Sequence, residues 1–115
     1  MQIERVGLPD SVTKLKLTGK LDINGSAIVE IPIALAAKDS KAVIIDMSGV
    51  TFVASLGVRH LVMAAKSLGS RGGKLVLYSL SEPVAETLGI MGIGDIIPMV
   101  GAEKDALGLV AGASS

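Results

Sequence analysis

The sequence predicts an α/β fold: a single domain in which a mixed β-sheet is backed by helices, with elements in the order ββαβαβαβα. Residues 42–46 (AVIID) begin with a continuous apolar run rich in β-branched side chains, which is typical of a central strand covered on both faces. Apolar residues then recur at helical spacing over residues 55–68. Strands that alternate with helices imply a partly parallel sheet with right-handed crossovers. A chain of 115 residues has the usual size of one domain.

Two short strands are predicted at the start of the chain, at residues 2–6 and 11–18. The turn-forming sequence GLPD separates them. Residues 15–18 (LKLT) alternate between apolar and polar with the period of a half-buried strand. We therefore expect a β-hairpin, after which the chain leaves the second strand at residues 19–22.

The next element is a helix over residues 24–38, which are rich in alanine and other apolar residues. Pro32 lies within it, and an interior proline removes a hydrogen bond at a cost of about 3 kcal/mol. Two interpretations remain open. Either the helix kinks at Pro32, or its regular part begins near Ile31 with the proline in the first turn.

The central strand at 42–46 should be followed by a loop over 47–54 and then by the helix at 55–68, which Gly69 ends. A strand is predicted at 74–79 and a short helix at 81–90, with Ser81 as its N-cap. Pro98 indicates that the strand at 96–100 lies at an edge of the sheet. A last helix is expected at 102–110. The domain then spans residues 1–110, and residues 111–115 form a flexible tail.

Composition excludes several classes of function. The 11 basic residues balance the 11 acidic ones and aromatic residues make up only 2%, so neither the charge nor the stacking groups of a nucleic-acid binder are present. There is no cysteine, which excludes disulfides and thiolate metal sites. The longest stretch without a charge, residues 47–58, is too short to insert into a membrane. No signal peptide is visible, so we expect a cytoplasmic protein.

Groups for catalysis are sparse. His60 is the only histidine and is expected at the surface. Asp22 and Asp46 could meet at a shared end of the sheet as an acid and a base, but capping and turn roles are the simpler interpretation. The glycine clusters do not follow the strand–loop–helix pattern of phosphate-binding sites. The sequence therefore predicts no catalytic residue, no metal site and no cofactor.

Ser55 stands where the helix at 55–68 should begin. Its hydroxyl could cap the helix by accepting a backbone N–H. It could also accept a phosphate, because a helix N-terminus carries partial positive charge and free N–H groups. Arg59, one turn later, could pair with that phosphate, and Gly57 leaves room for another backbone to approach.

Four segments resemble the STAS domain, and in particular the bacterial anti-sigma factor antagonists. They are GKLD at 19–22, VIIDMSGVTFVASLG at 43–57, GGKLVLYS at 72–79 and LGIMGIGDII at 88–97. The resemblance covers residues 3–109 and is most specific around Ser55. It implies a mixed sheet backed by helices, consistent with the fold predicted above.

The resemblance also implies a function. Members of that family bind an anti-sigma factor that is a serine kinase of the histidine-kinase-like ATPase type, and thereby release a sigma factor. Phosphorylation of the serine that corresponds to Ser55 cancels binding, and a PP2C-type phosphatase restores it. The implied partner-binding residues here are Asp22, Asn24, Ala54, Ser55, Leu56, Gly57 and Arg59.

The sequence departs from the family pattern at two positions beside the serine. Where the family usually has Asp-Ser-Ser-Gly, this chain has Ala54, Ser55, Leu56 and Gly57. A carboxylate and a hydroxyl that a kinase could contact are therefore replaced by apolar groups. The alternative function is a STAS scaffold that is not phosphorylated, or a partner subunit of a regulatory or transport-ATPase complex.

Overall fold

A mixed five-stranded sheet forms the centre of residues 1–111, the part of the chain that the computed structural model describes. The strands lie in sequence order, with β1 antiparallel to β2 and each later strand parallel to the one before it. They are β1 (Gln2–Leu8), β2 (Val12–Leu21), β3 (Ala42–Val53), β4 (Lys74–Tyr78) and β5 (Met99–Val100). Of the tail predicted at 111–115, all but Ala111 lies outside the described residues.

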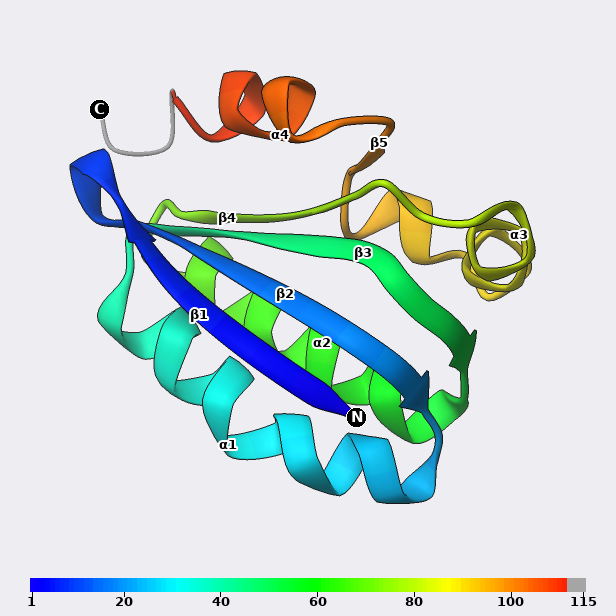
Figure 1. Ribbon diagram of the computed structural model, residues 1–115. Coiled ribbons are helices and arrows are strands. Elements are labelled where there is room, and N and C mark those ends of the chain that lie inside the picture. The colour runs from blue at the N-terminus through cyan, green and yellow to red at the C-terminus, as the bar shows by residue number, and fades with distance from the viewer. Residues whose placement is uncertain (112–115) are drawn as a thin grey trace.

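Helices cover both faces of the sheet. The two long helices, α1 (Ile23–Asp39) and α2 (Ser55–Gly69), lie side by side on one face, and α4 (Glu103–Val110) lies on the other (Figure 1). The short helix α3 (Glu82–Ile90) follows the carboxyl end of β4. The α/β class, the element order and the hairpin are confirmed.

Alternation along the strands divides the core into two layers. Side chains such as Leu15 and Leu17 of β2 and Ile45 of β3 belong to the larger cluster, which packs under α1 and α2. The smaller cluster lies under α4. Its members are Val12, Ala42, Ile44, Val76, Tyr78, Ala106 and Val110. Because β3 and β4 are covered on both faces, their apolar runs are continuous, as predicted.

The loop predicted at 47–54 is wrong, because β3 continues to Val53. Its second half pairs with the end of β2, with Leu21 opposite Val53, so β2 also runs further than predicted. Two shifts of register occur along this pairing. At Gly49 the two backbones approach so closely that a Cβ would lie 2.8 Å from the Leu17 carbonyl oxygen. The glycine and polar residues that suggested a loop therefore belong to a strand, and the glycine allows the backbones of β2 and β3 to approach closely.

The first helix begins at Ile23 and continues past Pro32, so the interpretation with a start near Ile31 is wrong. Asp22 caps the helix, and its Oδ1 accepts a hydrogen bond from the backbone N–H of Gly25 at 2.8 Å. Val29 and Ile33, on either side of the proline in sequence, are buried against the sheet. This burial offsets the hydrogen bond that the proline removes.

Three details of the C-terminal half differ from the prediction. The strand β5 is limited to Met99–Val100, and Pro98 contributes only its carbonyl, which accepts from the N–H of Leu77 at 3.0 Å. Ser81 occupies the N-cap position of α3, but its side chain makes no capping hydrogen bond. A 3-10 turn at Ile93–Asp95, which was not predicted, leads into β5. The helix predicted at 102–110 is confirmed.

A polar cluster fastens α4 to the sheet. Oε1 of Glu103, at the start of α4, lies 2.6 Å from Nζ of Lys14 on β2 and accepts a hydrogen bond at 3.0 Å from the Tyr78 hydroxyl on β4. These two hydrogen bonds lower the pKa of Glu103 below its usual 4.5. Burial, followed by the hydrogen bond to Glu103, raises the pKa of Tyr78.

Glu103→Gln should make the protein less stable at neutral pH, by about 1 kcal/mol given the partial exposure of the pair. Because the fold lowers the pKa of Glu103, its carboxylate stabilises the native state above pH 4.5, and this contribution is lost as the pH falls through the lowered value. Urea unfolding at pH 7 and at pH 3 should therefore show a smaller difference between variant and wild type at pH 3 than at pH 7. A difference that is the same at both pH values would contradict this role.

Candidate functional site

The carboxyl ends of β2 and β3 bring the starts of α1 and α2 together. Leu21 and Val53 are opposite each other at the end of the pairing, and the N–H of Ala54 donates to the carbonyl of Leu21 at 2.9 Å. Both helices then run back beneath the sheet from this edge (Figure 1). The residues singled out near 22–24 and 54–59 therefore lie in one region, which we call the Ser55 region.

The start of α1 is held tightly against the end of β2. A Cβ on Gly25 would lie 1.9 Å from the carbonyl oxygen of Lys20, so only glycine fits. Asp22 is partly buried and its carboxylate caps the helix, while Asn24 is exposed. Of these two predicted contact residues, Asn24 is the freer to meet a partner.

The start of α2 is open. Ser55 is exposed and is the first residue of the helix, so the interpretation of Ser55 as the N-cap is wrong. The N-cap is Ala54, whose carbonyl accepts the first helical hydrogen bond, from the N–H of Val58 at 3.1 Å. The backbone N–H groups of the first three residues of a helix have no carbonyl partner within the helix. The side chain of alanine has no oxygen that could accept a hydrogen bond from them. These donors and the helix dipole are available beside the Ser55 hydroxyl.

Ala54→Asp should stabilise the protein by about 1 kcal/mol, because the carboxylate would cap α2 and complement its dipole. The backbone at Ala54 already has the extended conformation of a capping residue, with φ −114° and ψ 165°. Thermal unfolding of Ala54→Asp and of the uncharged cap Ala54→Asn would separate the two contributions. A melting temperature that rises in neither variant would show that the helix end is satisfied in another way.

Gly57 has a different role from the one expected. It is buried, and a Cβ there would lie 3.0 Å from both the Leu21 Cβ and the Ser26 Oγ. Its missing side chain therefore makes room for this chain's own β2 and α1, instead of for the backbone of a partner. Gly57 sets how closely the two helix starts approach each other.

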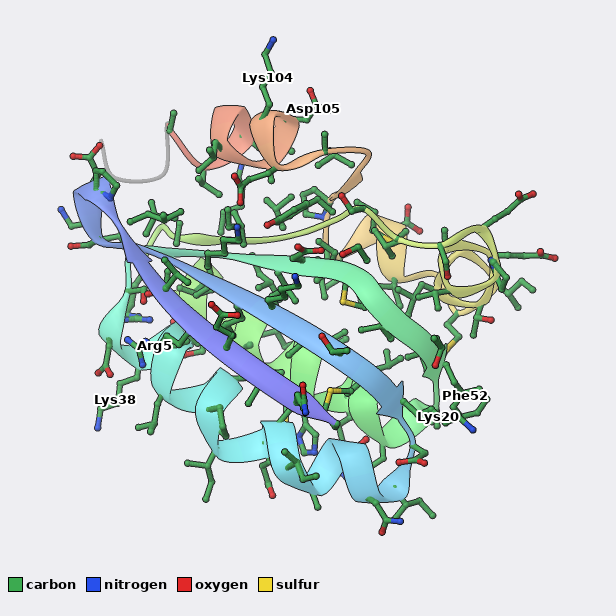
Figure 2. All side chains as sticks on the ribbon, in the orientation of Figure 1. Arg5, Lys20, Lys38, Phe52, Lys104 and Asp105 are labelled. Atoms are coloured by element: carbon green, nitrogen blue, oxygen red, sulfur yellow. The ribbon has the colours of Figure 1, made fainter. Side chains whose placement is uncertain are left out.

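The Ser55 region also contains exposed apolar side chains. Leu56 is 39% exposed, and two residues that were not predicted as site residues, Ile23 and Phe52, are 73% and 49% exposed. Phe52 projects from the end of β3 beside Lys20 (Figure 2). The sequence could have indicated that Phe52 is exposed, because it is next to Val53 and neighbouring residues on a strand point to opposite faces. This indication was missed because the stretch was interpreted as a loop. Arg59 is exposed one turn after Ser55.

The two carboxylates considered as a catalytic pair lie far apart. Asp46 lies in the middle of β3 opposite Lys16, whereas Asp22 follows Leu21, so the two carboxylates are roughly 20 Å apart along the sheet. The idea that they meet at a shared end is wrong. His60 is partly buried and lines a groove between α1 and α2. Within residues 1–111 there is no group of three His, Cys, Asp or Glu side chains that could hold a metal ion.

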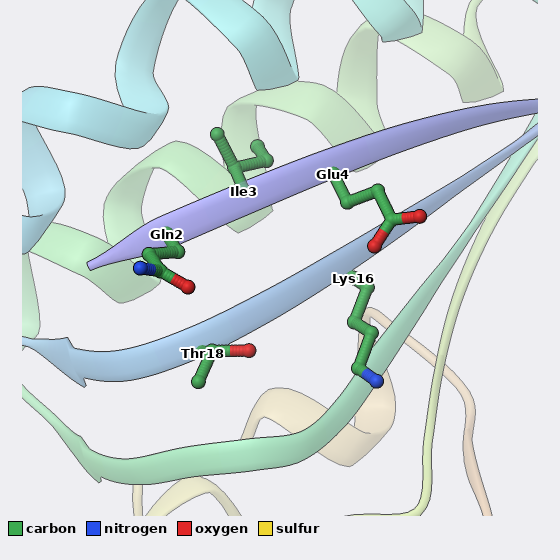
Figure 3. A pocket seen from close by; sticks show the side chains of 5 residues that line it. All are labelled: Gln2, Ile3, Glu4, Lys16 and Thr18. Carbon is green, nitrogen blue, oxygen red and sulfur yellow. The ribbon is translucent and has the colours of Figure 1, made fainter.

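Another hollow, of about 570 Å³, lies on the open face of β1 and β2, which α4 does not cover (Figure 3). Its lining includes Glu4 and Lys16, which are opposite each other on the two strands. Both side chains are exposed. The hollow is open and polar, and none of the predicted site residues lines it.

No helix among the described residues is long and apolar enough to cross a membrane.

A known protein family matches most of the chain. Residues 5–106 match the STAS domain. A curated relative, BtrV of Bordetella bronchiseptica, is named as a candidate anti-sigma factor antagonist. It is 29% identical over 87 residues, which are 73% of this chain and 75% of BtrV.

Solved structures share the fold. An anti-sigma factor antagonist from Mycobacterium paratuberculosis is 24% identical, with a TM-score of 0.83 over 96% of this chain and 95% of its own. The anti-sigma factor antagonist SpoIIAA in its unphosphorylated form is 20% identical, with a TM-score of 0.81 over 96% and 97%. The phosphorylated form of SpoIIAA, from Bacillus, is 18% identical, with a TM-score of 0.72 over 94% and 98%.

Proposed function

The chain belongs to the STAS domain family, and from this premise we propose that it is an anti-sigma factor antagonist controlled at Ser55. Its partner would be an anti-sigma factor that is also a serine kinase of the histidine-kinase-like ATPase type. The observation that carries the proposal is the placement of Ser55, which is exposed at the uncapped start of α2 and lies beside the start of α1. The relative BtrV is named for the same function.

The Ser55 region has the composition of a docking surface. Its centre is apolar, with Ile23, Phe52 and Leu56 exposed, and exposed apolar clusters rimmed by polar groups mark interaction sites. Fully covering one such side chain contributes about 1.5–3 kcal/mol. Asn24 and Arg59 supply polar contacts around it. Asp22 and Gly57 support the surface by holding the two helix starts in place, and Ala54 forms their junction.

A phosphate on Ser55 would oppose docking. It carries a charge of about −1.5 to −2, which the free N–H groups of α2 and Arg59 can accommodate in the unbound chain. In the complex the same charge would be pressed against an apolar surface and lose its water. Phosphorylation would thus cancel binding without unfolding the chain, and a PP2C-type phosphatase would restore it. Such a cycle would operate in the cytoplasm.

Ala54 and Leu56 remove two polar groups that a kinase could use, so phosphorylation should be slow. The direct test is to incubate the chain with ATP and a kinase-type anti-sigma factor from the same genome, and to locate any phosphate by mass spectrometry. We expect modification at Ser55, none in Ser55→Ala, and faster modification in Ala54→Asp. Phosphate on another residue, with Ser55 unmodified, would contradict the proposed switch.

The same two residues favour one alternative, a STAS subunit that docks without being phosphorylated, in a regulatory scaffold or a transport-ATPase complex. Stable binding of such a kinase with no phosphate on Ser55, in wild type and in Ala54→Asp alike, would support a scaffold. In neither case do we expect catalysis by the chain alone, because its carboxylates are dispersed and it has one histidine and no cysteine.

A further inference from the structure

The helix α1 is apolar on its outer face as well as on the face that packs against the sheet. Ile31 points away from the core and is 67% exposed, and Ile28 and Leu35 are also exposed. No other element among residues 1–111 covers this side of the helix (Figure 1). A helix that is apolar all round is normally buried on all sides, so this face requires an occupant.

Seven of the exposed residues of α1 form one continuous stripe, which we call the α1 seam, while the exposed residues Ile23, Glu30 and Asp39 lie outside it. The residues of the α1 seam recur at alternating spacings of three and four, the pattern by which one helix packs along another. The α1 seam consists of Asn24, Ala27, Ile28, Ile31, Ala34, Leu35 and Lys38, all of them exposed. Its middle is apolar and its two ends are polar. It is therefore a packing surface for a second helix of about the same length.

The α1 seam is complementary to itself. When two copies of α1 pack side by side around a two-fold axis, the row of large side chains in one copy meets the same row in the other. The row formed by Ala27 and Ala34 likewise meets its own equivalent, and small residues there let the helix axes approach to about 8 Å. A groove of about 220 Å³ borders Ala34, and Met63 of α2 lines it together with the polar side chains of Glu30 and His60.

Charge selects the direction of the pairing. Lys38 is the only charged residue of the α1 seam, and it is as far from Ile31 on one side as Asn24 is on the other. A parallel pair would place Lys38 against its own copy, and like charges that face each other are unfavourable. An antiparallel pair places Lys38 opposite Asn24 of the second copy, whose amide oxygen can accept a hydrogen bond from the ammonium group.

We propose that the chain forms a homodimer through the α1 seam, with the two α1 helices antiparallel and Ile31 near the two-fold axis. The α1 seam extends about 21 Å along the helix. Two helices that pack over this length should bury an area at the small end of the usual range for protein interfaces. We therefore expect a dimer that dissociates on dilution. The antiparallel arrangement puts the two Ser55 regions at opposite ends of the dimer.

Sedimentation equilibrium over a series of concentrations tests the interface. We expect the wild type to associate toward twice its 11.7 kDa mass, and Ile31→Glu to weaken association at least about 100-fold, because it juxtaposes two carboxylates. Ile90→Glu is the matched control, since Ile90 is 81% exposed at the end of α3 and outside the α1 seam, and it should still dimerise. A wild type that stays monomeric at sub-millimolar concentration would overturn the proposal. So would equal weakening by both substitutions.

Cross-linking tests the direction, because the chain has no cysteine of its own. Asn24→Cys and Lys38→Cys proteins are mixed and treated with a short bis-maleimide. The antiparallel dimer predicts the mixed product of the two variants, and little product from either variant alone, since identical positions would be about 21 Å apart. Efficient linkage within each variant and none between them would show a parallel pair and contradict the assignment.

Discussion

Ser55→Asp is expected to weaken binding of the kinase-type anti-sigma factor at least about 100-fold, whereas Ser55→Ala should bind as the wild type does. The added carboxylate would stand next to Leu56 in the Ser55 region, whose exposed apolar side chains include Ile23 and Phe52. On binding it would lose its water without gaining an opposite charge, which costs several kcal/mol. Isothermal titration calorimetry of the three proteins against the purified partner measures this difference.

Thermal unfolding of the same variants is the control for this result. Ser55 is exposed, and an acidic residue in the first turn of a helix is favourable, so Ser55→Asp should unfold at nearly the wild-type temperature. Loss of binding in a protein of unchanged stability would then report on the surface itself. Equal affinity of wild type and Ser55→Asp would contradict control at Ser55, while leaving open docking by an unphosphorylated scaffold.

Gly25→Ala is expected to cause the largest loss of stability of any single methyl addition in the Ser55 region, at least about 2–3 kcal/mol. The new Cβ would lie 1.9 Å from the Lys20 carbonyl oxygen, which is backbone and cannot swing aside. Either the strand end or the start of α1 must move. Because Asp22 and Asn24 belong to that junction, partner binding should weaken as well.

Gly89→Ala is the matched control, because Gly89 lies within α3 and a Cβ there would meet no atom within 4 Å. Alanine should stabilise that helix by about 0.5–1 kcal/mol relative to glycine. Urea unfolding should therefore give changes of opposite sign for the same chemical substitution. A Gly25→Ala protein as stable as the wild type would show that the junction between β2 and α1 is more accommodating than its geometry indicates.

Local patterns in the sequence were enough to predict the class of fold and most elements. The apolar run at 42–46 and the helical stripe at 55–68 each report on burial within one element. The second half of β3 escaped prediction because Gly49 and its polar neighbours are explained only by the β2 backbone opposite them. Similarly, nothing local showed whether α1 would continue through Pro32, since the burial of Val29 and Ile33 is a property of the assembled core.

The candidate site was predictable in position but not in detail. The segment around Ser55 located the start of α2, and the register of β2 and β3 places Asp22 at the same edge of the sheet. The inward orientation of Gly57 depends on contacts with Leu21 and Ser26, which are distant in sequence. The exposure of Ile23 and Phe52 likewise required the complete fold, because apolar residues at such positions are equally compatible with burial.

Release of the sigma factor is the most direct measurement of the proposed function. A preformed complex of the kinase-type anti-sigma factor with a fluorescently labelled sigma factor is titrated with the chain, and fluorescence anisotropy reports the free sigma factor. We predict stoichiometric release by the wild type and by Ser55→Ala, and no release by Ser55→Asp. A sigma factor that stays bound at saturating wild-type chain would contradict the assignment as an anti-sigma factor antagonist.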